Sequence, residues 1–201
     1  FFVPGHRFPV GFTGVMRRDR SVPAPEVVAR AREWFGARGL GYTTTVMMHR
    51  DADVAAELEA AGVSQFGNSP GMVLDAPLPE APLPAGVTVV EVETDAEARA
   101  FADVNGAAYA TYGMPPEVAR AQFADAAFFR QPHVAAFVAR VGDEAAAAAM
   151  VFVTHGVAGI YWVGTTPAAR GRGLAALVTR IAGNAGFAMG AQMAALQASV
   201  M

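Results

Sequence analysis

The stretch "YWVGTTPAARGRGLAALVTR", Tyr161–Arg180, predicts a strand, a turn and a helix that starts beside two arginines and two glycines. A helix N-terminus presents backbone N–H groups without intrahelical partners and carries the positive end of the helix dipole. Gly171 and Gly173 would leave these amides uncovered, and Arg170 and Arg172 would add positive charge. The joint therefore has the chemistry of a phosphate-binding site.

Other interpretations use the same residues. Glycines here would also permit close packing of the helix on the sheet, with the arginines simply solvated, and a single Gly-x-Gly motif does not decide between the two. Gly171, Gly173 and Ala176 fit the dinucleotide pattern Gly-x-Gly-x-x-Ala, but "TTPAAR" separates them from the strand and no acidic residue follows. This argues against a Rossmann site, and the lack of lysine excludes a P-loop.

Composition and charge narrow the classes of function. A net charge of -3 argues against a dedicated nucleic-acid binder, and the absence of cysteine excludes disulfides, thiolate zinc sites and a cysteine nucleophile. No Asp or Glu follows Glu144, so the last part of the chain carries arginines without competing carboxylates. The apolar stretch Leu174–Met201 is interrupted by Arg180, Asn184 and Gln192 and is not a membrane span. We expect a cytoplasmic protein with no nucleic-acid or membrane partner.

The stretch "DAPLPEAPLPAG", Asp75–Gly86, is expected to separate two domains, because it sustains neither a helix nor an interior strand. The predicted division is a first domain over 1–76, a Pro/Ala linker over 77–86 and a second domain over 87–201. In the first domain we expect a helix over 25–39, a strand over 42–49, a short helix over 53–62 capped by Asp53, and a strand over 71–75.

The second domain should begin with a strand over 87–92 and a helix opened by the capping box "TDAE", Thr94–Glu97. A second helix should run from Pro115-Pro116 to about Phe129. Three strands, 133–141, 145–154 and 157–165, form an antiparallel meander. The helix of the opening stretch then leads to a last strand over 191–200, parallel to its predecessor. Strand alternation would point Tyr161 and Trp162 to opposite faces of the sheet.

At these residues the chain resembles a known family. Arg170-Gly171-Arg172-Gly173-Leu174-Ala175 matches the Arg-x-x-Gly-x-Ala motif of the GCN5-related N-acetyltransferase (GNAT) superfamily, and the order of elements over Val87–Met201 is similar to the family's order. The resemblance implies an α/β (α+β) fold with a mixed central sheet flanked by helices. The sheet should splay between the strand ending at Thr165 and the one starting near Ala191. Residues 1–76 resemble part of a second, degenerate GNAT unit without the motif.

The resemblance implies acetyl-CoA, or a related acyl-CoA, as the donor and a small-molecule amine as the acceptor, with no metal. The pyrophosphate would lie on the amides at the helix start, and the pantetheine arm would pair with the backbone of the preceding strand. The cofactor-binding residues implied in this way are Trp162, Val163, Gly164, Thr165, Arg170, Gly171, Arg172, Gly173, Leu174, Ala175 and Ala176.

The catalytic groups are less clearly marked. Family members often use a Glu on the fourth strand as base, which "VAGIYWVGT" lacks, and a Tyr in a helix after the last strand as acid. We expect the natural chain to continue past Met201 with such a helix. Within the sequence, Tyr109 and Tyr112 flank the break between the first two helices, and His155 lies at a strand turn with a suitable intrinsic pKa. Lid packing fits both tyrosines equally, and a solvated turn histidine is the commoner role for His155.

His6, His49 and His133 show no metal-binding spacing and are interpreted as structural or surface residues. Two functions stay open: an acyl-CoA-dependent N-acetyltransferase, favoured by the intact motif, and a non-catalytic acyl-CoA-binding or assembly module, favoured by the missing acid and base. The sequence also leaves open whether the protein is a homodimer.

Overall fold

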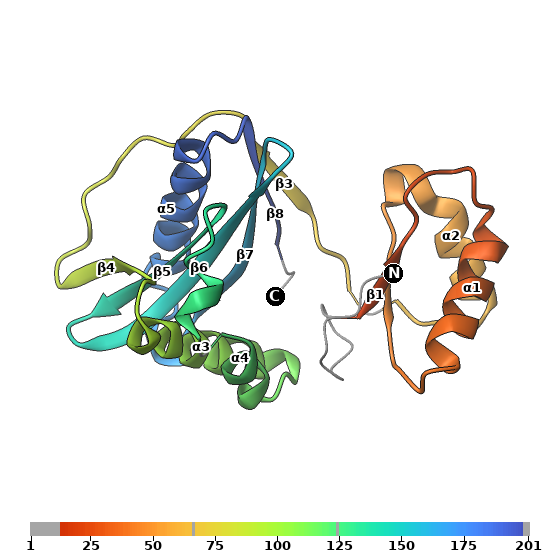
Figure 1. Cartoon of the computed structure of the whole chain (residues 1–201), viewed down its shortest axis with the longest axis horizontal. Helices are drawn as coiled ribbons and strands as arrows, with labels where there is room; N and C mark the ends of the chain where they lie inside the picture. Colours follow the sequence, from red (N-terminus) through yellow and green to blue (C-terminus); the bar gives the residue numbers. More distant parts are fainter. Residues whose placement is uncertain (1–12, 66, 124, 199–201) are drawn as a thin grey trace. The chain divides into compact units, whose positions relative to one another are not determined.

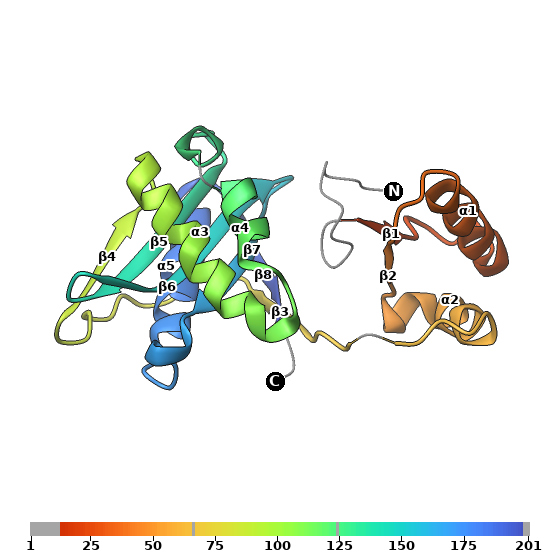
Figure 2. The same ribbon diagram turned by 90° about the horizontal axis from the view of Figure 1, so that it is seen from below.

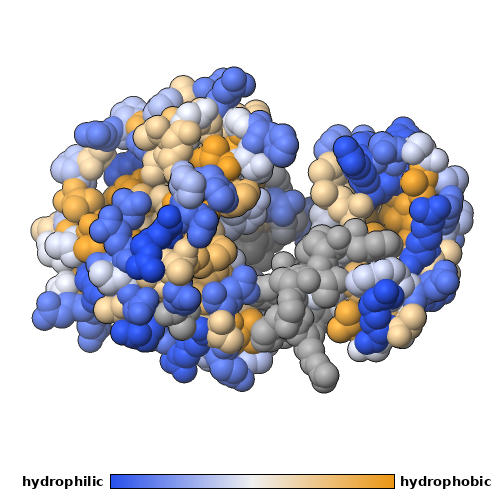
Figure 3. Space-filling model, viewed as in Figure 1, coloured by the Kyte–Doolittle hydropathy of each residue, from blue (hydrophilic) through white to orange (hydrophobic). Residues whose placement is uncertain are grey.

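The computed structural model describes residues 13–65, 67–123 and 125–198, and the chain divides into two compact units, Phe1–Asn68 and Ser69–Met201 (Figure 1). On the face shown in Figure 3, hydrophilic side chains cover much of each unit and apolar ones reach the surface in separate patches. Within the described residues, no helix combines the length and the apolar character needed to cross a membrane.

The first unit follows the order strand, helix, strand, helix. Strands β1 (Gly14–Met16) and β2 (Thr43–Thr45) pair in parallel, and helices α1 (Ala24–Gly36) and α2 (Met48–Ala60) follow them. The helix expected over 25–39 is confirmed, and its apolar face places Phe35 fully inside the core of the unit.

Two details predicted for this unit are wrong. The strand expected over 42–49 ends at Thr45, because Met48 already belongs to α2. Asp53 does not cap the helix but lies inside it, and the non-helical backbone of Asp51 (φ -120°, ψ 28°) marks a kink two residues earlier. Both carboxylates bind Arg17, so a tertiary ion pair rather than helix capping decides their placement.

Arg17 is a buried cation at the end of β1, with 5% of its surface exposed. Its guanidinium donates hydrogen bonds of 2.7 and 2.9 Å to Asp51 and of 2.7 and 2.8 Å to Asp53. Arg50 donates to the Asp51 carboxylate at 2.8 to 3.1 Å. The hydrogen bonds from Arg50 and Arg17 outweigh the effect of burial and lower the pKa of Asp51 to about 2.

This lowered pKa makes the stability of the first unit depend on pH. Asp51 titrates near 2 when folded and near 3.8 when unfolded, so the unfolded state binds more protons between these values. The contribution is complete above about pH 4 and is lost as the pH falls toward 2. We expect the free energy of unfolding, followed by Trp34 fluorescence in a Trp162→Phe background, to fall over this range. Asp51→Asn should remove most of this dependence of the free energy of unfolding on pH. An unchanged dependence in that variant would mean that other carboxyl groups cause it.

The second unit is a mixed six-stranded sheet in the order β3-β8-β7-β6-β5-β4. The strands β4 to β7 are antiparallel neighbours, and β8 is parallel to β7. The meander and the parallel last strand are therefore confirmed; positions 199 and 200 of that strand lie outside the described residues. The strands are β3 (Gly71–Leu74), β4 (Val87–Glu91), β5 (Val134–Val141), β6 (Glu144–Thr154), β7 (Val157–Thr165) and β8 (Met193–Gln197).

Helices cover both faces of this sheet: α3 (Asp95–Tyr109) and α4 (Pro116–Phe123) lie on one face, and α5 (Leu174–Ala188) lies on the other (Figure 2). The predicted capping box opens α3, with Thr94 and Glu97 exchanging hydrogen bonds. Helix α4 ends at Phe123 rather than near Phe129, and a 3-10 turn over 126–128 follows. The predicted α/β (α+β) fold is confirmed.

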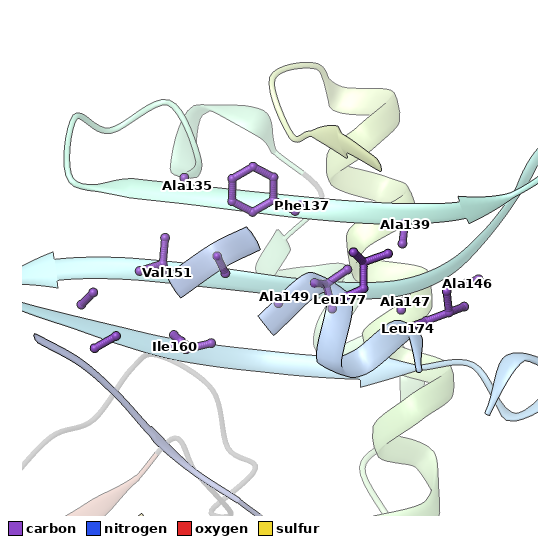
Figure 4. Packing of buried hydrophobic residues seen from close by; sticks show 14 of the residues in the cluster. Ala135, Phe137, Ala139, Ala146, Ala147, Ala149, Val151, Ile160, Leu174 and Leu177 are labelled. Carbon is purple, nitrogen blue, oxygen red and sulfur yellow. The ribbon is translucent and has the colours of Figure 1, made fainter. Parts of the chain in front are cut away.

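Small side chains form much of the core between α5 and the sheet (Figure 4). Alanine is a weak strand former, yet all residues from Ala146 to Val151 of β6 are buried, because helices cover both faces. The small side chains allow α5 to approach closely. A Cβ added to Gly186 would lie 2.4 Å from the Cβ of Ala158, whereas one added to Gly183 would lie 3.5 Å from Ile160.

Two substitutions in α5 should therefore have opposite effects on stability. Gly186→Ala pushes α5 away from the sheet and should lower the free energy of unfolding by about 1–3 kcal/mol. Gly183→Ala makes an ordinary van der Waals contact and should raise the free energy of unfolding by up to about 1 kcal/mol, because alanine has the higher helix propensity. Urea unfolding of the two variants measures the difference. Equal stabilities would mean that α5 can shift outward without loss.

The domain boundary predicted from the Pro/Ala stretch differs from the one in the structure. β3, expected to close the first domain, pairs antiparallel with β8, from Gly71 opposite Gln197 to Leu74 opposite Ala194. The two units divide between Asn68 and Ser69. The composition of 75–86 indicates an extended segment but not which elements it connects, and this is why the prediction failed.

The segment 75–86 connects two strands of the second unit instead of linking the two units. β3 and β4 lie at opposite edges of the same sheet, and the segment passes over α5 (Figure 1). Asn184 of α5 holds it by accepting from the Leu78 N–H at 2.9 Å and donating to the Leu78 carbonyl at 2.8 Å. Twelve extended residues reach about 37 Å, and five strand spacings need about 24 Å. The extended, proline-rich segment is thus long enough to cross the sheet and pass over α5.

Candidate functional site

The joint between β7 and α5 has the backbone geometry that its glycines suggest. Gly171 (φ 75°) and Gly173 (φ 74°) both adopt the left-handed conformation, which other residues rarely tolerate. A Cβ added to either would meet no atom within 4 Å. These glycines therefore turn the chain and leave open space above it. Close helix–sheet packing, the alternative role, belongs to Gly186 instead.

Helix α5 begins at Leu174 with uncapped amides. Gly173 occupies the N-cap position and has no side chain to accept from them, and the first hydrogen bond into the helix is from the Leu177 N–H to the Gly173 carbonyl. Leu174 and Leu177 are buried and anchor the first turn, while Ala175 and Ala176 are exposed. The amides of this turn are free to bind an anion.

Arg170 and Arg172 flank these amides. Both side chains are exposed, and neither forms an ion pair with any residue in the described part of the chain. Together with the positive end of the helix dipole, they give the joint positive charge without a competing carboxylate. The residues present therefore fit a phosphate group.

The predicted splay of the sheet is confirmed next to this joint. β7 and β8 pair over three residues, from Val157 opposite Met193 to Gly159 opposite Ala195. Beyond that point β8 continues along β3, and β7 continues along β6 up to Thr165. The edge of β7 that faces away from β6 is thus unpaired with β8 over 160–165, and its backbone N–H and carbonyl groups can pair with an extended ligand.

A β-bulge interrupts β7 inside this opening. Met150 pairs with Tyr161 and Ala148 with Gly164, so Trp162 and Val163 together lie opposite the single residue Ala149. Trp162 has a φ of 53°, which is unusual for a bulky residue. Strained backbone of this kind tends to occur at functional sites.

The bulge overturns the expected alternation of two aromatic side chains. Ile160 packs toward α5, and the ring of Tyr161 lies over Gly159 on the opposite face, where an added Cβ would meet it at 2.5 Å. Trp162 contacts Tyr109 of α3 on that same face. Tyr161 and Trp162 therefore both lie on the α3 face, because the bulge adds a residue and shifts the alternation.

Tyr109, Tyr112 and Trp162 form an aromatic wall beside the opening. Ring centroids are 5.1 Å apart for Tyr109 and Trp162 and 6.0 Å apart for the two tyrosines. Phe123 of α4 supports Trp162 edge-to-face at 4.8 Å. Burial, with a smaller effect of Tyr112, raises the pKa of Tyr109 to about 12, so its phenol stays protonated at neutral pH. The structure thus brings the two predicted tyrosines to the bulge.

His155 is not brought to this site. It occupies the turn that precedes β7, with a φ of 49° and a 2.8 Å contact between its Nδ1 and the Thr154 hydroxyl. The length of β7, about 26 Å, separates this turn from the end of β7 at Thr165 that leads to α5. His6 lies outside the described residues. In the described part of the chain, no three His, Cys, Asp or Glu side chains gather as a candidate metal site.

Two features of the site were missed in the sequence. The bulge leaves no signal in "GIYWVGT", because it depends on the pairing of β7 with β6. Gly164 faces Asn105, which is fully buried and donates to the Phe101 carbonyl at 3.0 Å. A Cβ on Gly164 would lie 2.8 Å from Asn105 Oδ1. A polar residue at a helix position flanked by buried ones was the available signal for Asn105.

Comparison with known proteins identifies a family and solved structures that are similar to this chain. Residues 82–193, more than half of the chain, match the family described as "Acetyltransferase (GNAT) domain". A GCN5-related N-acetyltransferase from Kribbella flavida aligns with 93% of the chain at 24% identity and a TM-score of 0.66, and the chain covers 69% of it. A GCN5-related N-acetyltransferase from Sphaerobacter thermophilus aligns with 87% of the chain at 16% identity and a TM-score of 0.60, with 58% of its own length covered. No curated protein matches the chain.

Proposed function

Because this chain belongs to the acetyltransferase (GNAT) family, we propose that it transfers an acetyl group from acetyl-CoA to the amino group of a small acceptor. One observation carries the proposal: an uncapped, positively charged helix N-terminus lies at the end of a strand whose edge is open and bulged. The two parts match the two ends of acetyl-CoA, a polyphosphate and an extended arm with a thioester.

The residues proposed for the donor fall into two groups. The backbone from Gly171 to Ala176, with the side chains of Arg170 and Arg172, would bind the pyrophosphate through charge-assisted hydrogen bonds. The open edge of β7 from Trp162 to Thr165 would pair with the amide groups of the pantetheine arm. Such pairing would bring the thioester near the bulge, beside the aromatic wall.

In the proposed reaction, the amine nitrogen attacks the thioester carbonyl. A C–N bond forms, the C–S bond breaks, the amine loses a proton and the thiolate of CoA gains one. Tyr109 is the proposed proton donor, because its phenol is protonated at neutral pH and its ring contacts Trp162 at the bulge. β7 carries no Asp, Glu or His, so we propose that the acceptor loses its proton to water. The rate should then rise with pH as more of the acceptor amine is in its free-base form.

The proposal predicts different effects for two of the candidate catalytic residues. Tyr109→Phe keeps the ring packing and removes the phenolic proton, and it should lower kcat about 100-fold, as expected for loss of a general acid. His155→Ala should leave kcat unchanged, because the turn lies at the other end of β7. Thiol release from acetyl-CoA in the presence of a panel of primary amines measures both. Full activity in Tyr109→Phe would exclude Tyr109 as the proton donor.

A second function, a non-catalytic acyl-CoA-binding module, is favoured by the lack of a carboxylate on β7. It predicts that calorimetry detects binding of acetyl-CoA while no amine releases thiol. The enzyme predicts both binding and release, so the two measurements together separate the two functions.

A further inference from the structure

A row of apolar side chains lies on the face of the sheet that α3 packs against. It runs over β7, β8 and β3, beside the bulge, where α3 does not cover the sheet. Gly159, Ala195 and Val73 lie opposite one another on β7, β8 and β3, and they share one face. The ring of Tyr161 lies over Gly159 at one end of this row, and Met193 lies two residues before Ala195 on β8. We call Tyr161, Ala195, Val73 and Met193 the apolar row.

Three of the four side chains of the apolar row are exposed to solvent, and the fourth, Ala195, is half-buried. Val73 is 65% exposed, Tyr161 54% and Met193 36%. On the other face of the same strands, Leu74 and Leu196 pack against the core beneath α5. Contiguous exposed apolar side chains beside an open strand edge are typical of a binding surface.

The row continues into the aromatic wall. Tyr161 precedes Trp162 in the chain, and the bulge places both on the same face. Trp162 contacts Tyr109, which contacts Tyr112. A ligand with its reacting atom at the bulge would therefore have apolar side chains on both sides of it. α5 occupies the opposite face, so the α3 face is the direction from which an acceptor can approach.

Carboxylates are scarce along this surface. The segment 145–201, which supplies Tyr161, Met193 and Ala195, contains no Asp or Glu. Asp75 follows β3, but it lies two residues beyond Val73, about 7 Å along the strand, and on the side away from the bulge. A polyamine or a basic peptide would place extra ammonium groups on this surface without counter-charges, which is costly.

We propose that the acceptor is a primary monoamine with an aromatic or branched aliphatic group. The apolar group lies on the apolar row, and the amino group reaches the bulge at Trp162. Burial of that group against Tyr161 and Val73 supplies the binding energy, and the aromatic wall receives the amino end through its ring faces. This inference rests on the proposed function.

The first experiment compares 2-phenylethylamine, ethylamine and spermidine as acceptors, and measures their binding to the CoA-loaded protein by calorimetry. We expect 2-phenylethylamine to exceed both others in kcat/KM by about tenfold or more, as for the loss of a large apolar contact. A preference for spermidine would overturn the inference and leave the acetyltransferase intact. Binding of 2-phenylethylamine without any turnover would uphold the surface and overturn the enzyme. If 2-phenylethylamine shows no binding and no turnover, the inference is overturned.

The second experiment uses two residues of β3 that point to opposite faces. Val73→Asp places a carboxylate in the apolar row and should raise the KM for 2-phenylethylamine about tenfold or more. It should also reduce the ratio of kcat/KM between 2-phenylethylamine and spermidine, and it should leave the KM for acetyl-CoA unchanged. Met72→Asp, at a neighbouring position that is 56% exposed, should change none of these. A lower melting temperature in Val73→Asp with an unchanged ratio of amines would identify the row as an internal packing surface and overturn the inference.

Discussion

Gly173→Asp is expected to lower the affinity for CoA roughly 30- to 150-fold, or about 2–3 kcal/mol. Asp is among the few residues that tolerate a φ of 74° and also cap a helix well, so α5 should still form. Its carboxylate would then accept the hydrogen bonds of the first-turn amides and repel the phosphates that those amides are proposed to bind.

Gly173→Asn is the matched control for this substitution. It has nearly the same shape and the same tolerance of the left-handed conformation, but no charge, and should lose much less affinity. Gly39→Asp, in the first unit at a φ of 61°, controls for the change in net charge. Arg170→Ala should weaken binding by about 1.5–3 kcal/mol, the range for hydrogen bonds to charged groups. Calorimetry with CoA that shows equal affinities for the Asp and Asn variants would exclude the α5 N-terminus as the phosphate site.

Asp51→Ala is expected to destabilise the first unit by about 3–5 kcal/mol, the usual cost of breaking a buried ion pair, because Arg17 would keep only the exposed Asp53 as its partner. The Arg17 side chain is 2% exposed, and so is that of Asp51. Such a loss is a large fraction of the stability of a small domain, so the unit should unfold at a much lower urea concentration than in the unsubstituted protein.

Asp53→Ala is the comparison for this variant. Asp53 also binds Arg17, but its side chain is 44% exposed, so water can replace much of what is lost. Urea unfolding followed by Trp34 fluorescence in the Trp162→Phe background measures both variants. Similar small losses in both would show that Arg17 finds solvent when Asp51 is removed. CoA binding should be unchanged in both, since the proposed residues for CoA lie in the second unit.

The sequence by itself determined the features that depend on neighbouring residues. The capping box at Thr94 and Glu97, the meander of β5 to β7 and the glycine-rich start of α5 were all predicted where they occur. Each depends on contacts within a few residues or on a local periodicity, so the printed order of residues contains the information. The motif at Arg170 to Ala175, through its resemblance, also predicted the splay between β7 and β8.

The tertiary structure decided the features that depend on distant partners. Asp53 has the sequence of a helix cap, but Arg17 binds it together with Asp51. The segment 75–86 has the composition of a linker, but the pairing of β3 with β8 makes it a crossing within one unit. The bulge at Trp162 exists because β7 has one more residue than β6 between two pairs, and it places Trp162 on the same face as Tyr161, where regular alternation would have put it on the opposite face. Ion pairs, strand partners and register join residues far apart in the chain, and local propensity carries no information about them.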